Sequence, residues 1–380
     1  MKLWYFTEQQ YHPAWDLSDG PIRNIPPSSL IDRDVCADLF DRYYEEFAWM
    51  EELGIDIAVN EHHSTFQSMV PTTFLHVAAL ARVTKKSRLL SLGSPLGQRP
   101  DPLRLAEEIG VADMMSRGRI EVGFIKSVPW EYFNSNANPA RLMDRFWEAN
   151  DFVIKALSTR DGPFSWHGEY FDYRNVNIIP PPYQQPHPPM WMTGQSTGSA
   201  KAIAQRRYVA VCVMSGPHVA GPFFSAYREQ YEKTHGAAPS LDRLAYSSYL
   251  AVGNNEDEAR IRAQRVHKWV EMLSSQHLGF QHAAGYATPT DFARMLTAGK
   301  LGHAGAATPT IDELRAKHTM FWGTPDQVVD QIKNFYRAVG GFGQLLTQMG
   351  GYATKADTFD SMKLMVKEVL PQLQDLHRTL

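Results

Sequence analysis

Two adjacent histidines follow a segment that has the length and composition of a buried strand. Glu61-His62-His63 comes directly after Ile55–Asn60. Neighbouring side chains on a strand point to opposite faces, so the two imidazoles cannot bind one ion without a bend. No second cluster of His, Asp or Glu has metal-ligand spacing, and we therefore expect no metal site. Histidines at this place suit proton transfer or hydrogen bonding near neutral pH, and the alternative is a structural histidine bound to a neighbouring loop.

A second segment has the residue types that bind phosphate. Gly194-Gln195-Ser196-Thr197-Gly198-Ser199 opens a helix that we expect to run to about Arg207. Its first N–H groups, the positive end of its dipole and its serine hydroxyls together suit a phosphate, although ordinary N-capping explains the same residues. Lys126 ends the apolar run Gly123–Ile125 and could bind a phosphate as a point charge, although a solvated lysine is the commoner meaning.

The segment between the histidines and the lysine predicts how the chain positions them. Arg88–Gly93 and Arg119–Phe124 are strand-like, and a helix between them has Asp101 as N-cap, Pro102 in its first position and Gly118 as C-cap. Two strands joined by one helix pair in parallel, because a parallel pair needs a crossover of this length. This segment is therefore a βαβ unit.

The unit belongs to a longer alternation of strands and helices. Eight strand candidates occur along the chain: Lys2–Phe6, Ile55–Asn60, Arg88–Gly93, Arg119–Phe124, Met190–Thr193, Tyr208–Met214, Ala245–Val252 and Phe342–Gln348. Eight repeats favour an α/β fold closed into a (β/α)8 TIM barrel over an open sheet, and no strand is followed by the G-x-G-x-x-G of a dinucleotide-binding fold. In such a barrel the chemistry lies at the carboxyl ends of the strands, where all three candidate segments fall.

Other segments complete the expected single domain of residues 1–380. The helix Pro71–Val83 should turn Leu75, Ala78, Ala79 and Val83 inward. An excursion at 160–189 contains a hairpin that turns at His167-Gly168. The segment 277–320 is rich in glycine and alanine and weakly patterned in its first part, so we interpret it as a lid insertion.

Composition limits the classes of partner and compartment. The chain has 380 residues and a net charge of −3, which gives no electrostatic reason to bind nucleic acid or an anionic membrane. Its two cysteines, Cys36 and Cys212, are too few for a disulfide framework. The N-terminus begins on a strand-like run without a signal-peptide pattern, and no apolar run approaches the length of a membrane span. We therefore expect a cytoplasmic protein.

Taken together, the chain resembles the bacterial luciferase-like flavin monooxygenase family. The resemblance lies in LGIDIAVNEHH, RPDPLRLAEEIGVADMMSRGRIEVGF, PPYQQPHPPMWMTGQSTGSAKAIA, FWGTPDQVVDQI and EVLPQL. It implies a (β/α)8 barrel that takes reduced FMN from a separate reductase and activates O2 as a C4a-peroxyflavin to oxygenate a small organic substrate. We also expect a homodimer or a higher homo-oligomer.

The resemblance also implies roles for single residues. His62 corresponds to the catalytic histidine, and Gly93-Ser94 to a strand end against the flavin ring where a cis peptide is usual. The residues that would bind the cofactor are Glu61, Gly93, Ser94, Lys126, Arg141, Gly194, Gln195, Ser196 and Ser199. Where the family has a Gly-Arg-Gly-like turn, this chain has Ile125-Lys126-Ser127, which keeps a charge but loses the bidentate fork of arginine. Weaker phosphate binding would suit a flavin that arrives and leaves as a substrate.

Three alternatives to this function remain at this stage. One is an F420-dependent oxidoreductase of the same superfamily, which moves hydride without oxygen. Another is a non-catalytic flavin-binding protein of the same fold, which a histidine retained at position 62 disfavours. The third is a barrel hydrolase, against which the missing metal cluster argues.

Overall fold

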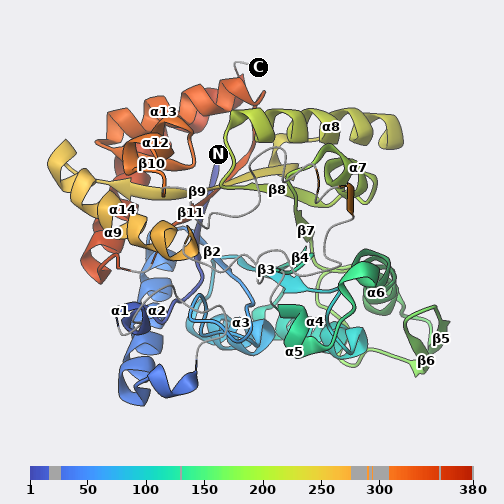
Figure 1. Cartoon of the computed structure of the whole chain (residues 1–380). Coiled ribbons are helices and arrows are strands. Elements are labelled where there is room, and N and C mark those ends of the chain that lie inside the picture. Colours follow the sequence, from blue (N-terminus) through green and yellow to red (C-terminus); the bar gives the residue numbers. More distant parts are fainter. Residues whose placement is uncertain are drawn as a thin grey trace.

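The fold is a closed parallel barrel surrounded by helices (Figure 1). The computed structural model describes residues 1–16, 27–128, 131–274, 289, 290, 293, 308–350 and 352–378. The barrel strands are β1 (Lys2–Thr7), β2 (Asp56–Val59), β3 (Leu89–Pro95), β4 (Ile120–Ile125), β7 (Met190–Thr193), β8 (Val209–Val213), β9 (Leu244–Val252) and β11 (Gln344–Gln348). They pair in this order, and β9 closes the ring by pairing with both β8 and β11. The predicted (β/α)8 barrel is confirmed.

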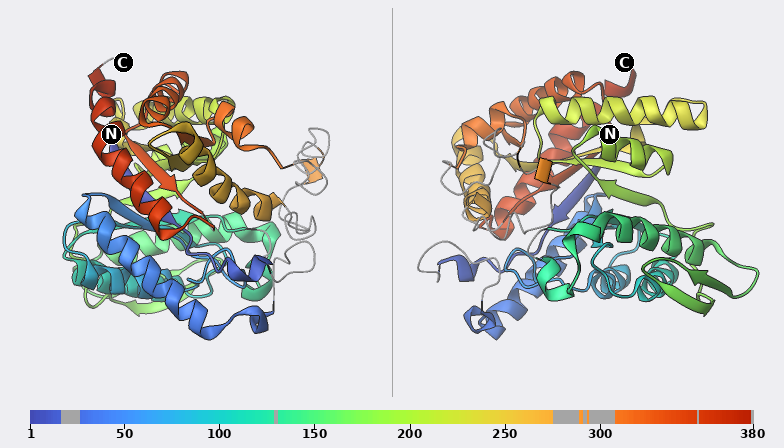
Figure 2. Two further views of the ribbon diagram at one scale, coloured as in Figure 1. Left: turned by 90° about the vertical axis from the view of Figure 1, so that its left-hand side faces the viewer. Right: turned by 45° about the vertical axis from the view of Figure 1, so that its right-hand side comes forward.

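Helices cover the outside of the barrel (Figure 2). They include α2 (Arg33–Glu52), α3 (Thr73–Val83), α4 (Pro102–Ser116), α6 (Leu142–Ser158), α7 (Thr197–Gln205), α8 (Pro217–His235), α9 (Glu256–Ser274), α13 (Pro325–Ala338) and α14 (Lys355–Leu364). Shorter helices are α1 (Pro13–Asp16), α5 (Glu131–Ser135) and α12 (Ile311–Ala316). No helix in the described part of the chain has both the length and the apolar character needed to span a membrane.

The N-cap predicted for the central βαβ unit is confirmed, whereas the C-cap is Arg117, one residue before the predicted Gly118. The Asp101 side chain accepts hydrogen bonds from the N–H groups of Leu103 and Arg104 at the start of α4. The helix ends through Arg117 and Gly118 in the left-handed region, at φ values of 56° and 80°.

The inside of the barrel is filled with apolar side chains below the carboxyl ends of its strands. Trp4 and Trp191 meet edge to face, with ring centroids 5.3 Å apart, and Phe6, Leu90, Leu92 and Leu346 belong to the same buried cluster. A ligand therefore has room only at the mouth of the barrel, as is usual for this fold.

The sequence-based prediction for the buried face of α3 was wrong. Leu75 and Val83 are 74% and 47% exposed, whereas Phe74, Val77 and Leu80 are buried. Apolar residues occur around most of this helix, so their spacing did not distinguish the face that packs on the barrel.

Two segments lie outside the regular repeat. Residues 160–189 contain the antiparallel pair β5 (Phe164–His167) and β6 (Asp172–Val176), which projects from the edge of the molecule (Figures 1 and 2). Most of the expected lid, from 277 to 307, lies outside the described residues. Its last part contains α12 and leads into a strand that the sequence did not predict, β10 (Met320–Gly323), which pairs with the end of β9.

We expect Gly123→Ala to destabilise the barrel. A Cβ on Gly123 would lie 2.7 Å from the Ser91 carbonyl oxygen and 3.2 Å from the Leu92 Cα, so backbone of β3 would have to move. The free energy of unfolding in urea should fall by about 1–3 kcal/mol. Gly221→Ala, within α8, is the control, because the nearest atom to its Cβ would be the Ala338 carbonyl oxygen, 3.7 Å away, and it should leave stability unchanged or slightly raised. Equal stability of the two variants would contradict the close approach of β3 and β4.

Candidate active site

A cavity of about 340 Å³ lies at the carboxyl ends of the barrel strands. It is lined by residues from the ends of six strands and the loops that follow them: Phe6, Glu8, Asn60, His62, Leu92, Ile125, Lys126, Ser127, Val128, Thr193, Gly194, Gln195 and Val213. We call it the central cavity. Four of the residues proposed from the sequence, His62, Lys126, Gly194 and Gln195, lie together in its wall.

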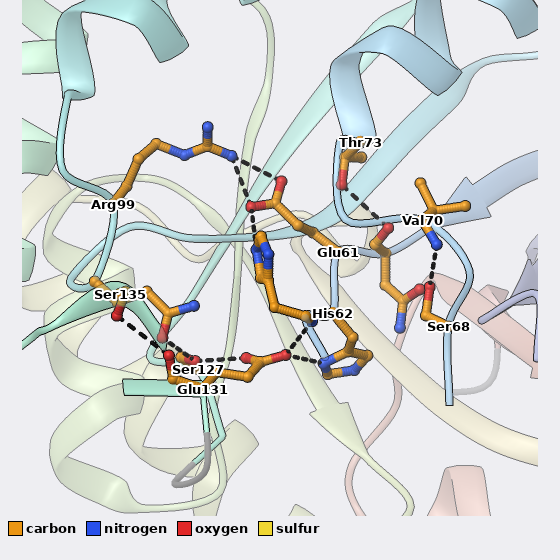
Figure 3. Close-up of polar contacts among 12 residues, drawn as sticks. Glu61, His62, Ser68, Val70, Thr73, Arg99, Ser127, Glu131 and Ser135 are labelled. Atoms are coloured by element: carbon orange, nitrogen blue, oxygen red, sulfur yellow. Dashed lines mark hydrogen bonds and ion pairs between the residues drawn. The ribbon is translucent and has the colours of Figure 1, made fainter. Parts of the chain in front are cut away.

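One buried carboxylate fixes the orientation of His62 (Figure 3). Glu131 lies at the start of α5 and is fully buried, and its Oε1 is 2.9 Å from His62 Nδ1. The same oxygen accepts the backbone N–H of His63 at 2.8 Å, and Oε2 accepts the Ser127 hydroxyl at 2.7 Å. Glu131 therefore connects the loop after β2 to the turn after β4.

This pairing keeps His62 protonated. Burial alone would lower the pKa of His62, but the charge and hydrogen bond of Glu131, helped by the charges of Glu8 and Glu61, raise it to about 9. For Glu131, burial alone would raise the pKa. The charge of His62 and the hydrogen bonds that the carboxylate receives outweigh this effect and lower it. At neutral pH the pair is thus imidazolium and carboxylate, with Nδ1–H donating to Glu131.

Glu8 is a second carboxyl group of the central cavity, and the sequence analysis did not identify it. Trp4 and Phe6 of β1 point into the barrel, so Glu8, two residues further, lies on the same face. Glu8 is only partly accessible, and burial raises its pKa, although the charge of His62 opposes this effect. The rule that barrel chemistry follows strand ends would have identified Glu8 directly after Thr7.

Glu61 and His63 point to a different cavity, which we call the polar cavity. It has a volume of about 270 Å³ and is also lined by Gln98 and Arg99. Arg99 Nη2 lies 2.7 Å from both oxygens of Glu61, and His63 Nε2 lies 3.2 Å from Glu61 Oε1 (Figure 3). The structure therefore does not bring Glu61 into the central cavity beside His62.

Gly194 and Gln195 line the central cavity just before α7 (Thr197–Gln205), whereas the predicted Ser196 and Ser199 are not among its lining residues and cap the helix. Ser196 Oγ accepts the N–H of Ser199, and the Ser199 side chain bonds back to the backbone of Ser196. Gln195 donates from Nε2 to the Val213 carbonyl oxygen at 2.9 Å, which connects β7 to β8 at the mouth of the barrel. Both the capping and the ligand-binding interpretations of this segment are thus compatible with the structure.

The remaining predicted residues lie at the edge of the site or outside it. The Leu92–Gly93 peptide is cis, and a Cβ on Gly93 would lie 2.7 Å from the Gly123 carbonyl oxygen. Ser94 is fully buried behind the cavity wall. Arg141 pairs with Glu169 and lies over the Tyr170 ring, so the structure does not bring it to the central cavity.

Comparisons with known proteins agree with this architecture. The sequence pattern of the luciferase-like monooxygenases matches residues 37–341. An uncharacterized protein, y4wF, of Sinorhizobium fredii is 29% identical over 213 residues, 55% of this chain and 61% of that protein. The oxygenase component of the flavin-dependent trigonelline monooxygenase of Acinetobacter baylyi is 28% identical over 153 residues, 39% of this chain and 41% of that protein. These matches span less than two thirds of either relative.

Solved structures show the same fold over nearly the whole chain. The monooxygenase RslO1 from Streptomyces bottropensis has a TM-score of 0.75 at 20% identity and covers 98% of this chain and 99% of its own. The oxygenating component of 3,6-diketocamphane monooxygenase from Pseudomonas putida, in complex with FMN, has a TM-score of 0.71 at 22% identity and covers 98% of both chains. An F420-dependent secondary alcohol dehydrogenase has a TM-score of 0.69 at 17% identity, covering 98% of this chain and 99% of its own.

The barrel is thus a fold that this chain shares with solved monooxygenases and with an F420-dependent dehydrogenase. The family match covers most of the chain, and the chain belongs to the luciferase-like monooxygenase family.

Replacing Glu131 should change the pKa of His62 without disrupting the central cavity. In Glu131→Gln the His62 pKa should fall from about 9 toward the ordinary value of 6.5, because the neutral amide no longer stabilises the imidazolium. NMR titration of the histidine ring signals measures this change. The exposed Glu107→Gln is the control and should leave the titration unchanged.

The same pair affects stability, with a sign that follows from the raised pKa. The part that comes from His62 is fully present below about pH 6.5 and is lost as the pH rises through about 9. The part that comes from Glu131, whose pKa is lowered, is lost as the pH falls through that lowered pKa and the carboxylate is protonated. Glu131→Gln should therefore lose most stability near neutral pH and less above pH 9 or in strong acid. An unchanged His62 titration in this variant would contradict the assignment of Glu131 as its partner.

Proposed function

We propose that this protein is a flavin-dependent monooxygenase that uses reduced FMN and O2 to oxygenate a small organic substrate. A separate reductase would supply the reduced flavin. The observation that supports this proposal most strongly is the position of His62, which pairs with Glu131 and lines the same cavity as Lys126, Gly194 and Gln195. Acting as an enzyme rather than a flavin carrier requires such a donor at the reacting end of the cavity.

The residues of the central cavity fit FMN on chemical grounds. Lys126 supplies a cation and the start of α7 supplies N–H groups and hydroxyls, which together suit the phosphate. A Cβ on Gly194 would lie 2.6 Å from Ser199 Oγ, so only glycine lets the strand end approach this helix start closely. Apolar side chains of Phe6, Leu92 and Val213 supply the wall that a planar ring system needs.

When bound, reduced FMN would supply the activation of O2. The chain would then have three tasks: to hold the phosphate, to exclude water, and to place one proton. Lys126 neutralises the phosphate, and the apolar wall keeps water out of the reacting end. His62 would donate from its second ring nitrogen while its Nδ1–H stays hydrogen-bonded to Glu131. The Glu8 carboxyl group lies in the same cavity.

Binding of FMN should depend on Lys126 through the phosphate alone. Lys126→Ala should weaken the binding of reduced FMN by about 10- to 100-fold, the usual effect of losing a charged hydrogen bond. It should leave the binding of riboflavin, which has no phosphate, unchanged. Lys201→Ala, on the exposed side of α7, is the control. Fluorescence titrations with FMN, riboflavin and F420 measure these affinities. Tighter binding of F420 than of reduced FMN would instead favour an F420-dependent oxidoreductase.

Removing His62 should uncouple oxygen use from product formation. With NADH, a separate flavin reductase, FMN and a substrate that the wild type oxygenates, His62→Ala should still bind reduced FMN. Product yield should fall by about 10²- to 10⁴-fold, the usual contribution of a general acid or base, and hydrogen peroxide released per NADH should rise. Chromatography of the product and a peroxide assay measure the two quantities.

His63→Ala is the matched control, because His63 lies in the polar cavity and not in the central one. Equal and small effects of both substitutions would favour the flavin-binding protein without catalysis. Efficient turnover with NAD(P)H in the absence of any reductase would exclude the two-component scheme.

A further inference from the structure

A third cavity shares His62 with the central cavity. It has a volume of about 260 Å³ and lies between the loop after β1, the start of α2 and the loop after β2. Its largest lining side chains are Tyr11, Ile31, Phe40, Phe66 and Met69. We call it the apolar cavity. Its walls are held together by backbone hydrogen bonds from Tyr11 N–H to the Phe66 carbonyl oxygen and from Met69 N–H to the Gln9 carbonyl oxygen, both 3.0 Å long.

The apolar cavity offers almost no charge to a ligand. Among the described residues that line it, His62 alone has an ionisable side chain that is charged near neutral pH. The positive charge of His62 is already paired with Glu131 and lies near Glu8 and Glu61, which disfavours an added anion. A cation would meet the imidazolium itself, and either ion would lose its hydration without a partner in this wall.

Three polar side chains of this wall already have partners in the fold. Tyr11 Oη accepts the N–H of Asp32 at 2.8 Å, and Ser68 Oγ accepts the N–H of Val70 at 3.1 Å. Ser64 Oγ accepts Nδ2 of Asn134 at 2.9 Å. The cavity should therefore bind most tightly a ligand that buries apolar surface and needs few hydrogen bonds.

The polar cavity is a weaker candidate for the same ligand. It shares no lining residue with the central cavity, so His62 does not face it. Its cation, Arg99, is already paired with both oxygens of Glu61, which leaves little charge for an anionic ligand. A substrate there would lie away from the imidazolium that the proposed reaction uses.

We propose that the apolar cavity binds the organic substrate, and that this substrate is an uncharged, largely apolar molecule of about two fused rings. The proposal rests on the proposed function, because it assigns the second reactant of that reaction. The size follows from the volume, since an apolar cavity of about 150 Å³ holds one benzene. Placed there, the substrate would contact His62, which also lines the central cavity, so one side chain would contact both reactants.

The test uses the full chain and the uncharged naphthalene dye prodan, whose fluorescence changes on entering an apolar site. Cys36→Phe and Ile31→Trp fill the cavity from two different segments, and each should weaken prodan binding by about tenfold or more. Val35→Phe is the matched control, because Val35 is the neighbour of Cys36 on α2 but is 38% exposed and does not line the cavity. Its affinity for prodan should equal that of the wild type.

Competition against prodan tests the chemical class. Uncharged 2-acetylnaphthalene should displace the dye at least about tenfold better than 2-naphthoate or 2-naphthylmethylammonium, which have the same rings with a negative or a positive charge. The His62 ring signals should shift on prodan binding. Equal competition by a charged analogue, or prodan binding that neither filling variant weakens, would overturn the proposal.

Failure of this proposal and failure of the proposed function can be told apart. Suppose that prodan binds as predicted but no uncharged bicyclic compound is oxygenated with reduced FMN and O2. The apolar cavity is then a binding site as proposed, and the proposed monooxygenase activity is contradicted. If a substrate is oxygenated and Ile31→Trp leaves its KM unchanged, the monooxygenase holds and the cavity assignment is overturned. Titration with FMN on each variant shows that the central cavity is intact.

Discussion

Closure of the sheet requires β9 to form hydrogen bonds along both of its edges. Ala245 lies opposite Val211 of β8 on one side and Gln344 of β11 on the other. In a ring of parallel strands all carboxyl ends open at one mouth, so residues as distant in sequence as Glu8 and Gln195 line one cavity. The packed interior around Trp4 and Trp191 leaves no other place for a ligand inside the ring.

At that mouth, the buried Glu131 carboxylate determines the arrangement of the polar groups. It holds His62 in the charged state and connects two loops through backbone and hydroxyl donors. One of those donors is Ser127, which has a φ of 87° directly after Lys126. A left-handed conformation favours glycine, and a serine there costs about 1–3 kcal/mol. Its hydroxyl contacts Glu131 Oε2 and Gln98 Oε1, each at 2.7 Å, and these contacts offset part of that cost.

Much of the fold could be predicted from the sequence, because regular spacing and capping residues carry the information locally. Asp101, Pro102 and Gly118 mark the bounds of α4, and strand-length apolar runs mark the eight barrel strands. The short strand β10 gave no such signal, because its four residues pair only with the end of β9 and follow a weakly patterned segment. The buried face of α3 was predicted wrongly for the opposite reason, because too many residues of this helix are apolar.

The candidate site, like the fold, could be predicted from the sequence only in part. Strand-end position and family resemblance identified His62, Lys126, Gly194 and Gln195, which do line one cavity. The partner of His62 could not be found by spacing, because Glu131 is 69 residues further along the chain and lies on a five-residue helix without periodicity. The resemblance also could not show that Arg99 draws Glu61 into a separate cavity, since that depends on side-chain pairing.

The chemistry available to this site follows from the two nitrogens of a single imidazole. Nδ1 of His62 is committed to Glu131, so one ring nitrogen remains to serve both the central and the apolar cavities. A single donor cannot hydrogen-bond fully to two groups at once, and its proton must therefore pass to whichever group develops negative charge first. Because Glu131 keeps the imidazolium stable to about pH 9, in the proposed reaction His62 would give up this proton only to a group that becomes strongly basic. Under that proposal the site would protonate a reacting group rather than a resting one.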